Sequence, residues 1–230
     1  INKVNTDHIK LYDGVPTGHA VIQVDKEGQN CILLYGGTNQ MITKEQVDST
    51  LLNFSKGDFI ILQNEINLLD YIIEEAHKKG LIIVLNPSPM NEKIYSIRLD
   101  YVDYFMLNEV EASEICGHAP NHLLIESLSS KYPEAKIVLT LGEKGAIYRY
   151  KNFTVEHGIF EVPVVDTTGA GDTFTGYFIG SIAQGYDVKE SLRLASLAAA
   201  ISVSKKGAET SIPFMEDVKN STLKLKQKVN

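Results

Sequence analysis

The residues most able to do chemistry lie in one short stretch, where two acids flank a threonine pair and a Gly-Ala-Gly run. Asp166 ends a strand-like apolar run, and Asp172 opens a second apolar run with helical spacing. Small residues at a helix entrance let a ligand approach the backbone and leave N–H groups available for an anion. Gly169, Ala170 and Gly171 therefore predict an anion hole. A carboxylate beside a bound anion is repelled unless it has a chemical role, so we infer that Asp172 is a general base in phosphoryl transfer to a hydroxyl.

A simpler interpretation of the same stretch is a glycine-rich helix cap, and the Gly-Ala-Gly-Asp run alone does not separate the two. Other nucleotide motifs are absent from the sequence. There is no G-x-x-x-x-G-K-[ST] segment, and Gly169, Gly171 and Gly176 do not have the spacing of a dinucleotide site. A G-x-S-x-G nucleophile motif is also absent.

The elements that must position this stretch alternate between strands and helices. Continuous apolar runs predict strands, and amphipathic spacing predicts helices. The expected strands span residues 58–63, 81–85, 102–107 and 136–141, and the longer expected helices span residues 66–79, 121–131, 171–184, 188–204 and 215–228. This order predicts an α/β fold with a mostly parallel central sheet and helices on both faces. The polar loops at the strand ends would share one edge of the sheet, where such folds bind ligands.

Composition and charge narrow the function classes. A formal net charge of -7 argues against a nucleic acid or an acidic membrane as partner. No apolar run reaches transmembrane length, and no secretory signal opens the chain. The two cysteines lack metal-binding spacing, and the six histidines are scattered. We therefore expect a cytoplasmic protein without a cysteine or histidine metal centre.

Three polar residues at the strand ends each allow two interpretations. Asn108 and Glu111 have the spacing of a helix cap, which explains both residues without further chemistry. The functional alternative is that they orient water bound to Mg²⁺ near phosphates, because Mg²⁺ keeps several of its waters. Glu65 either accepts hydrogen bonds from a polyol or is simply solvated, and the sequence leaves this open.

The stretch from Asp166 to Phe174 resembles the C-terminal signature of the ribokinase (PfkB) family of carbohydrate kinases. Four further segments resemble family segments in the same order: Leu85–Pro89, Asn108–Glu111, Thr140–Gly145 and Lys206–Pro213. The resemblance covers essentially the whole chain. It implies a ribokinase-like three-layer α/β/α fold and an ATP-dependent sugar kinase.

The resemblance also implies a role for each site residue. Asp172 would be the base and, with Glu65, would contact the sugar, while Gly169, Ala170 and Gly171 would form the anion hole. The residues that would contact ATP are Asn108, Thr140, Leu141, Gly142, Glu143, Lys144, Gly145, Gly171 and Ser196. Glu111 would hold Mg²⁺ through water. The ligands of a K⁺ ion would be Asp166, Thr168, Ser202, Lys205, Gly207 and Ser211.

Ribose is the first choice of substrate, giving ribose 5-phosphate, because Glu65 looks like the sugar-contacting glutamate of ribokinases. Fructose, tagatose, 2-keto-3-deoxygluconate and nucleosides are the alternatives within the family. Two other classes are an inactive nucleotide-binding remnant and an α/β binding module that is not a kinase. A calorimetric titration with ATP and ribose separates these classes, because a remnant binds the nucleotide alone.

The family's N-terminal part has no counterpart in this chain, and Gly36–Asn39 is not its G-G-x-G-x-N signature. The chain resembles the C-terminal three quarters of the family fold, and trimming, a separate N-terminal segment or a natural fragment would each explain this. We expect a single domain over residues 1–230, with a β hairpin within residues 11–37 that represents the sheet edge and lid region. An unpaired edge strand favours association, so a homodimer is one option for the oligomeric state.

Overall fold

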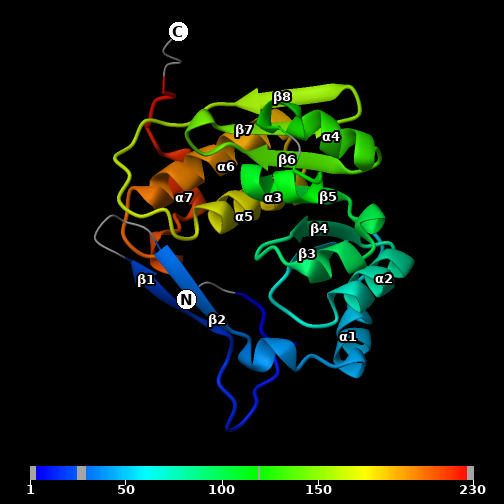
Figure 1. Ribbon diagram of the computed structural model, residues 1–230. Coiled ribbons are helices and arrows are strands. Elements are labelled where there is room, and N and C mark those ends of the chain that lie inside the picture. The colour runs from blue at the N-terminus through cyan, green and yellow to red at the C-terminus, as the bar shows by residue number, and fades with distance from the viewer. Residues whose placement is uncertain (1–3, 25–29, 119, 227–230) are drawn as a thin grey trace. The chain divides into compact units, whose positions relative to one another are not determined.

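The computed structural model describes residues 4–24, 30–118 and 120–226 (Figure 1). The chain forms two compact units, Ile1–Val102 and Asp103–Asn230, here called unit 1 and unit 2. Both units combine strands with helices. That the chain acts as a single domain over residues 1–230 stays a prediction of the sequence.

Unit 1 contains two separate strand pairs. Its elements are β1 (His19–Val24), β2 (Asn30–Tyr35), the 3₁₀ turn η1 (Gly37–Gln40), α1 (Lys44–Leu51), β3 (Phe59–Gln63), α2 (Leu69–Lys79), β4 (Ile82–Asn86), and the 3₁₀ turns η2 (Glu92–Ser96) and η3 (Leu99–Tyr101). β1 and β2 are antiparallel, with His19 opposite Tyr35, and they are the strands of the predicted hairpin. β3 and β4 are parallel, with Gln63 opposite Asn86. The polar residues that end these two strands therefore share one edge, as the sequence predicts.

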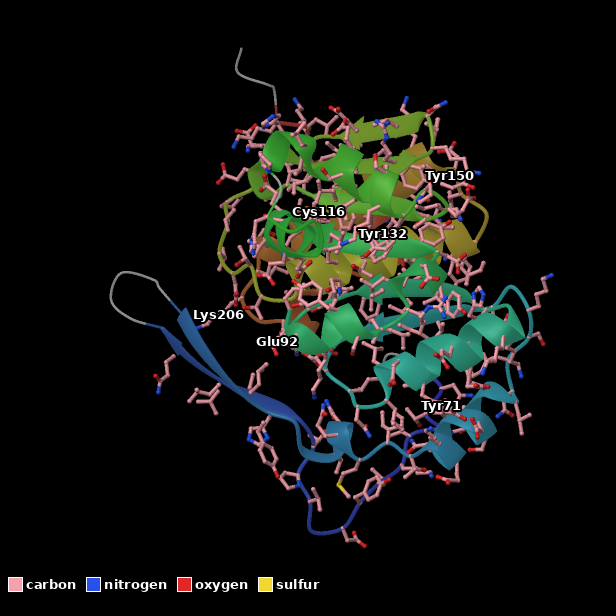
Figure 2. The ribbon with its side chains drawn as sticks, turned by 45° about the vertical axis from the view of Figure 1, so that its right-hand side comes forward. Tyr71, Glu92, Cys116, Tyr132, Tyr150 and Lys206 are labelled. Carbon is pink, nitrogen blue, oxygen red and sulfur yellow. The ribbon has the colours of Figure 1, made fainter. Side chains whose placement is uncertain are left out.

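Local sequence signals set the helices of unit 1. The Thr43 side chain caps α1 by accepting a hydrogen bond of 3.2 Å from the Gln46 N–H group. The α1 and α2 helices are joined by Tyr71, labelled in Figure 2, whose hydroxyl donates to the Asp48 carboxylate at 2.7 Å. This hydrogen bond raises the pKa of Tyr71 to about 12, because a deprotonated phenol would face a carboxylate.

Unit 2 carries most of the candidate site. Its elements are β5 (Tyr104–Asn108), α3 (Glu109–Ile115), η4 (Asn121–Leu123), α4 (Leu124–Lys131), β6 (Lys136–Thr140), η5 (Gly142–Lys144), β7 (Ala146–Tyr150), β8 (Phe153–His157), α5 (Ala170–Ala183), α6 (Val188–Val203), η6 (Glu209–Ser211) and α7 (Met215–Lys219). β5 and β6 are parallel, with Asn108 opposite Thr140. β7 pairs antiparallel with both β6 and β8.

Helices cover both faces of the unit 2 strands. The side chains of Tyr104–Leu107 and Ile137–Leu139 are buried throughout, which requires cover on each face. Figures 1 and 2 show α3 and α4 on one side of these strands and α5 and α6 on the other. The α/β class and the helix layers agree with the sequence prediction.

The last helix is shorter than predicted. The sequence pattern indicates a helix over residues 215–228, but α7 ends at Lys219. Within the described part, the chain then runs alongside residues 159–161, where the Lys226 N–H group donates to the Ile159 carbonyl at 2.8 Å. Pairing with a distant segment satisfies these backbone groups and overrides the weak helical pattern.

The apolar run before Asp166 does not form a strand either. Val164 and Val165 are 65% and 58% exposed, in an irregular segment. The Val165 N–H group donates to the Val203 carbonyl at the end of α6, at 2.8 Å. Local composition predicts a strand, but among the described residues this segment belongs to neither sheet. Across those residues, no helix combines the length and the apolar character that crossing a bilayer requires.

Candidate active site

The entrance of α5 has the geometry of an anion site. Gly169 precedes the helix with a φ of 73°, a left-handed conformation that glycine adopts most easily. The Thr173 N–H group and hydroxyl both bond to the Gly169 carbonyl, at 2.8 and 2.9 Å, and they set the first turn. Among the described residues, none accepts a hydrogen bond from the Gly171 N–H group. This donor lies at the positive end of the helix dipole, beside the exposed side chain of Asp172.

The Asp166 carboxylate joins the two loops that flank this entrance. One oxygen accepts from the Thr168 N–H group at 2.9 Å, and the other accepts from the Gly207 N–H group at 3.0 Å. The hydrogen bond with the Thr168 side chain, followed by these two backbone donors, lowers the pKa of Asp166 to about 2. The carboxylate therefore stays ionised and can hold a cation.

The remaining residues predicted for K⁺ lie in the last turn of α6 and in the segment that follows it, up to the end of η6. Ser202 and Ser211 are 1% and 0% exposed, and their hydroxyl oxygens lie 2.7 Å apart. The Ser211 hydroxyl also donates to the Ala208 carbonyl at 2.7 Å, while the Lys205 N–H group donates to the Ser202 carbonyl at 3.0 Å. The structure thus brings Asp166, Thr168 and Gly207 together, and it pairs Ser202 with Ser211. No cluster of three or more His, Cys, Asp or Glu side chains with metal-binding geometry occurs in the described part of the chain.

Asn108 and Glu111 form a reciprocal helix cap. The Asn108 side chain accepts from the Glu111 N–H group, and the Glu111 carboxylate accepts from the Asn108 N–H group, both at 2.9 Å. Glu111 is only 7% exposed. The capping interpretation of this pair is therefore confirmed, and a role beside magnesium stays a proposal.

The loop from Thr140 to Gly145 continues from the strand next to Asn108. The Thr140 hydroxyl donates to the Leu107 carbonyl at 3.1 Å, and the Leu141 N–H group donates to the Gly145 carbonyl at 2.8 Å. Gly145 has a φ of 99°, and a Cβ atom there would overlap the His157 carbonyl oxygen. The loop is a tight turn that leaves the residues of η5 exposed.

Two further predicted residues belong to other elements. Ser196 is 8% exposed within α6. Glu65 belongs to unit 1, where it follows β3 with an exposed side chain. Its carbonyl accepts a hydrogen bond of 2.7 Å from the Gln40 side-chain amide. No local signal in the sequence identifies Gln40, because its role depends on a contact between segments far apart in the chain.

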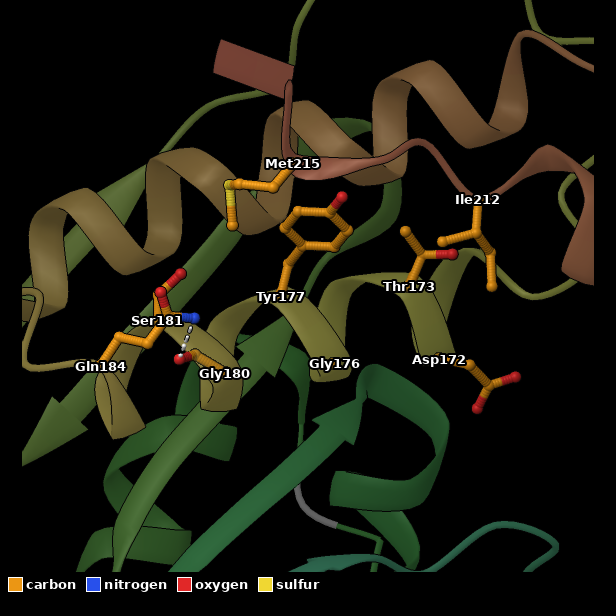
Figure 3. Close-up of a pocket in the computed structure, with 9 residues that line it drawn as sticks. All are labelled: Asp172, Thr173, Gly176, Tyr177, Gly180, Ser181, Gln184, Ile212 and Met215. Atoms are coloured by element: carbon orange, nitrogen blue, oxygen red, sulfur yellow. Dashed lines mark hydrogen bonds between the residues drawn. The ribbon is translucent and has the colours of Figure 1, made fainter. Parts of the chain in front are cut away.

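A cavity of about 280 Å³ begins at Asp172 and runs along α5, as Figure 3 shows. Its lining residues are Asp172, Thr173, Gly176, Tyr177, Gly180, Ser181, Gln184, Ile212 and Met215. The Tyr177 hydroxyl donates to the Pro213 carbonyl at 2.6 Å and holds the segment before α7 against the helix. Sequence reasoning did not identify this cavity, although Asp172, Gly176, Gly180 and Gln184 recur at four-residue intervals, which places them on one helix face.

The chain is similar to proteins of known activity. The profile of the family described as pfkB family carbohydrate kinase matches residues 2–215. Ribokinase of Schizosaccharomyces pombe is 33% identical over 228 residues, which cover 95% of this chain and 71% of that protein. Deoxyribokinase of Salmonella typhi is 31% identical over 225 residues, with 93% and 72% covered. The structure of Arabidopsis thaliana ribokinase complexed with ribose and ATP has a TM-score of 0.74 and 28% identity, over 90% of this chain and 69% of that one.

The fold and the site define an α/β enzyme that transfers a phosphoryl group from ATP to a sugar. This chain belongs to the pfkB family of carbohydrate kinases. The ribokinase-like fold implied by the sequence signature is confirmed.

The low pKa of Asp166 predicts a stability change in acid. Its folded-state pKa, about 2, lies below the ordinary value of 3.8, so the ionised carboxylate stabilises the fold at neutral pH and loses this effect as the pH falls from about 4 toward 2. We expect the free energy of unfolding of the wild type to approach that of Asp166→Asn over this interval, as measured by urea denaturation.

Asp187→Asn is the matched control, because Asp187 accepts one backbone hydrogen bond as the cap of α6 and asparagine caps a helix equally well. A constant difference between the wild type and Asp166→Asn from pH 5 to pH 2 would contradict the assignment.

Proposed function

We propose that this protein phosphorylates the 5-hydroxyl of ribose, with ATP as the donor. The observation that carries the proposal is the entrance of α5, where Asp172 lies beside the available Gly171 N–H group. The matches to ribokinases over nearly the whole chain support ribose. The match to a deoxyribokinase at 31% identity makes 2-deoxyribose the second candidate.

In the proposed reaction, the sugar hydroxyl oxygen bonds to the γ-phosphorus and the bond to the β–γ bridging oxygen breaks. The hydroxyl proton passes to the Asp172 carboxylate, and ADP leaves. Charge on the transferred phosphoryl oxygens would be stabilised first by the available Gly171 N–H group at the positive end of α5, in the anion hole expected from Gly169, Ala170 and Gly171. The Ala170 N–H group donates to the Thr167 carbonyl at 3.2 Å and would have to exchange this bond for one to the phosphoryl group. Such a loose transition state depends mainly on positioning and electrostatic stabilisation.

The nucleotide would lie along the edge formed by β5 and β6. Asn108 and Thr140 are opposite each other in the register, so contacts to ATP from both strands and from the loop of Leu141, Gly142, Glu143, Lys144 and Gly145 come from one edge. Gly145 packs against the His157 carbonyl, and this contact holds the loop in place at that edge. Ser196 would line the base pocket.

The oxygen atoms near the α5 entrance and beside Asn108 suit two cations, K⁺ and Mg²⁺. Carboxylate, hydroxyl and carbonyl oxygens suit a hard cation, and those of Asp166, of Ser202 at the end of α6 and of Ser211 in η6 would hold K⁺. The Ser211 hydroxyl group donates to the Ala208 carbonyl, and its oxygen still has acceptor capacity for a cation. Mg²⁺ would neutralise charge on the phosphates, with Glu111 acting through water.

The proposal extends to the oligomeric state. The β1–β2 sheet exposes Val21, Leu33, Leu34 and Tyr35, which are 50–58% exposed. An apolar two-stranded sheet is marginally stable in water by itself, and this supports a homodimer that covers it. A cytoplasmic location stays a prediction of the sequence.

A panel of sugars tests the substrate. We expect ribose to give the highest kcat/KM in an assay of ADP release, followed by 2-deoxyribose and then by fructose, tagatose and 2-keto-3-deoxygluconate. ATP binding without any sugar binding in calorimetry would instead favour a nucleotide-binding remnant. No ATP binding at all would reject the kinase.

Replacement of the base tests the chemistry. Asp172→Asn is expected to lower kcat by about 10²–10⁴-fold, because the hydroxyl proton loses its acceptor, while the affinity for ATP stays within a few-fold. Asp187→Asn at the start of α6 is the matched control, since it also removes an exposed carboxylate from a helix entrance. Turnover of Asp172→Asn close to the wild-type value would remove the assignment.

The proposed cation site predicts that the turnover rate depends on which monovalent cation is present. We expect kcat to be several-fold higher in KCl than in LiCl, because a K⁺ ion matches the spacing of carbonyl and hydroxyl oxygens better than the small Li⁺ ion. Ser211→Ala is expected to reduce this ratio. Equal rates in the two salts at one ionic strength would count against the site.

A further inference from the structure

We propose that Asn67 is a positioning residue for the sugar-contacting carboxylate of Glu65. This inference rests on the proposed function. It concerns how the loop of residues 64–67, which follows β3, is held against the segment of residues 37–42 that follows β2. All of these residues lie in unit 1.

The Asn67 side chain binds both backbone groups of one distant residue, Ile42. Its amide oxygen accepts from the Ile42 N–H group at 3.0 Å, and its amide nitrogen donates to the Ile42 carbonyl at 2.7 Å. The Asn67 backbone N–H group also donates to the Asn39 carbonyl at 3.4 Å. A side-chain amide is suited to this role because it donates and accepts at the same time. The half-buried Asn67 therefore acts as a two-point clamp.

The backbone around Glu65 is held at two further places. The Gln40 side-chain amide donates to the Glu65 carbonyl at 2.7 Å. Asn64 is 8% exposed, and its amide donates to the Pro89 carbonyl at 2.7 Å, while its N–H group donates to the Ser88 carbonyl at 3.0 Å. The Glu65 side chain itself is exposed. The loop thus has a fixed backbone and a carboxylate available to a ligand.

The segment of residues 37–42, which Asn67 binds, also contacts the residues just before β1. The Thr38 N–H group donates to the Pro16 carbonyl at 3.1 Å, and the Gly18 N–H group donates to the Asn39 side chain at 3.4 Å. The 3₁₀ turn η1 therefore contacts the start of β1 on one side and the Glu65 loop on the other. A shift of the hairpin base changes the position of Glu65 through Asn67.

This arrangement predicts a specific kinetic effect. A loop without strand or helix pairing depends on such side-chain bonds, and a small displacement of a substrate-contacting group reduces binding strongly. Loss of the clamp should weaken sugar binding and leave the nucleotide affinity unchanged, because none of its contacts involves the residues proposed for ATP.

A double-mutant cycle between Asn67→Ala and Glu65→Gln tests the inference. In the wild-type background, Asn67→Ala is expected to raise the KM for the preferred sugar about tenfold, since two hydrogen bonds are lost. The KM for ATP should stay within about twofold. In the Glu65→Gln background, Asn67→Ala should change the sugar KM by less than about twofold, because the group it positions is already gone.

Additive effects in this cycle, or an equal rise in the KM for ATP, would assign Asn67 a purely structural role and overturn the inference. Gln40→Ala provides an independent second variant, because it removes one hydrogen bond from an exposed side chain and should give a smaller effect in the same direction. If Asn67→Ala does not fold, additivity of Gln40→Ala with Glu65→Gln overturns the inference.

Asn53→Ala is the matched control. The Asn53 amide also makes two hydrogen bonds to backbone carbonyls in unit 1, those of Ser49 and Thr50 at 3.0 and 3.2 Å, but it makes none to the Glu65 loop. It should leave both KM values unchanged. A wild type that phosphorylates no sugar in the panel would instead reject the proposed function, so the two failures are distinguishable.

Discussion

The carboxylate of Asp166 accepts hydrogen bonds from the N–H groups of Thr168 and Gly207, and thereby holds the loop before α5 against the loop after α6. A half-buried charge is stable when several donors satisfy it. The orientation of the α5 entrance, and with it the place of Asp172, depends on this interaction. The buried Ser202–Ser211 pair joins the two ends of the loop after α6. The residues proposed for the anion and those proposed for the cation are therefore held by the same pair of loops.

Parallel pairing of strands within each unit positions the other residues of the candidate site. In unit 2, the register that sets Asn108 opposite Thr140 brings two strand ends to one edge. In unit 1, the register that sets Gln63 opposite Asn86 does the same for the loop that carries Glu65. A carbohydrate kinase needs a phosphoryl-transfer site and a sugar site, and each unit carries residues proposed for one of them. The side-chain amides in unit 1 give its loop the rigidity that a strand would otherwise provide.

Local signals made much of the fold predictable. The caps at Thr43 and Asn108 depend on residues three positions apart, so the sequence is sufficient to identify them. The helix expected over residues 171–184 agrees with α5 to within one residue. The helix expected over residues 215–228 was wrong beyond Lys219, because the chain there pairs with a segment about 65 residues earlier, as the register of Phe160 with Leu225 shows.

The sequence by itself determined the class of the protein and the residues of the α5 entrance, because the spacing of Asp166, the glycines and Asp172 is a local property. Only the tertiary structure decided which distant groups these residues meet. The bond from Gly207 to Asp166 joins residues 41 positions apart, and the clamp from Asn67 to Ile42 joins residues 25 positions apart. Such contacts depend on strand register and loop conformation, which arise when the whole chain packs and which no short stretch of sequence specifies.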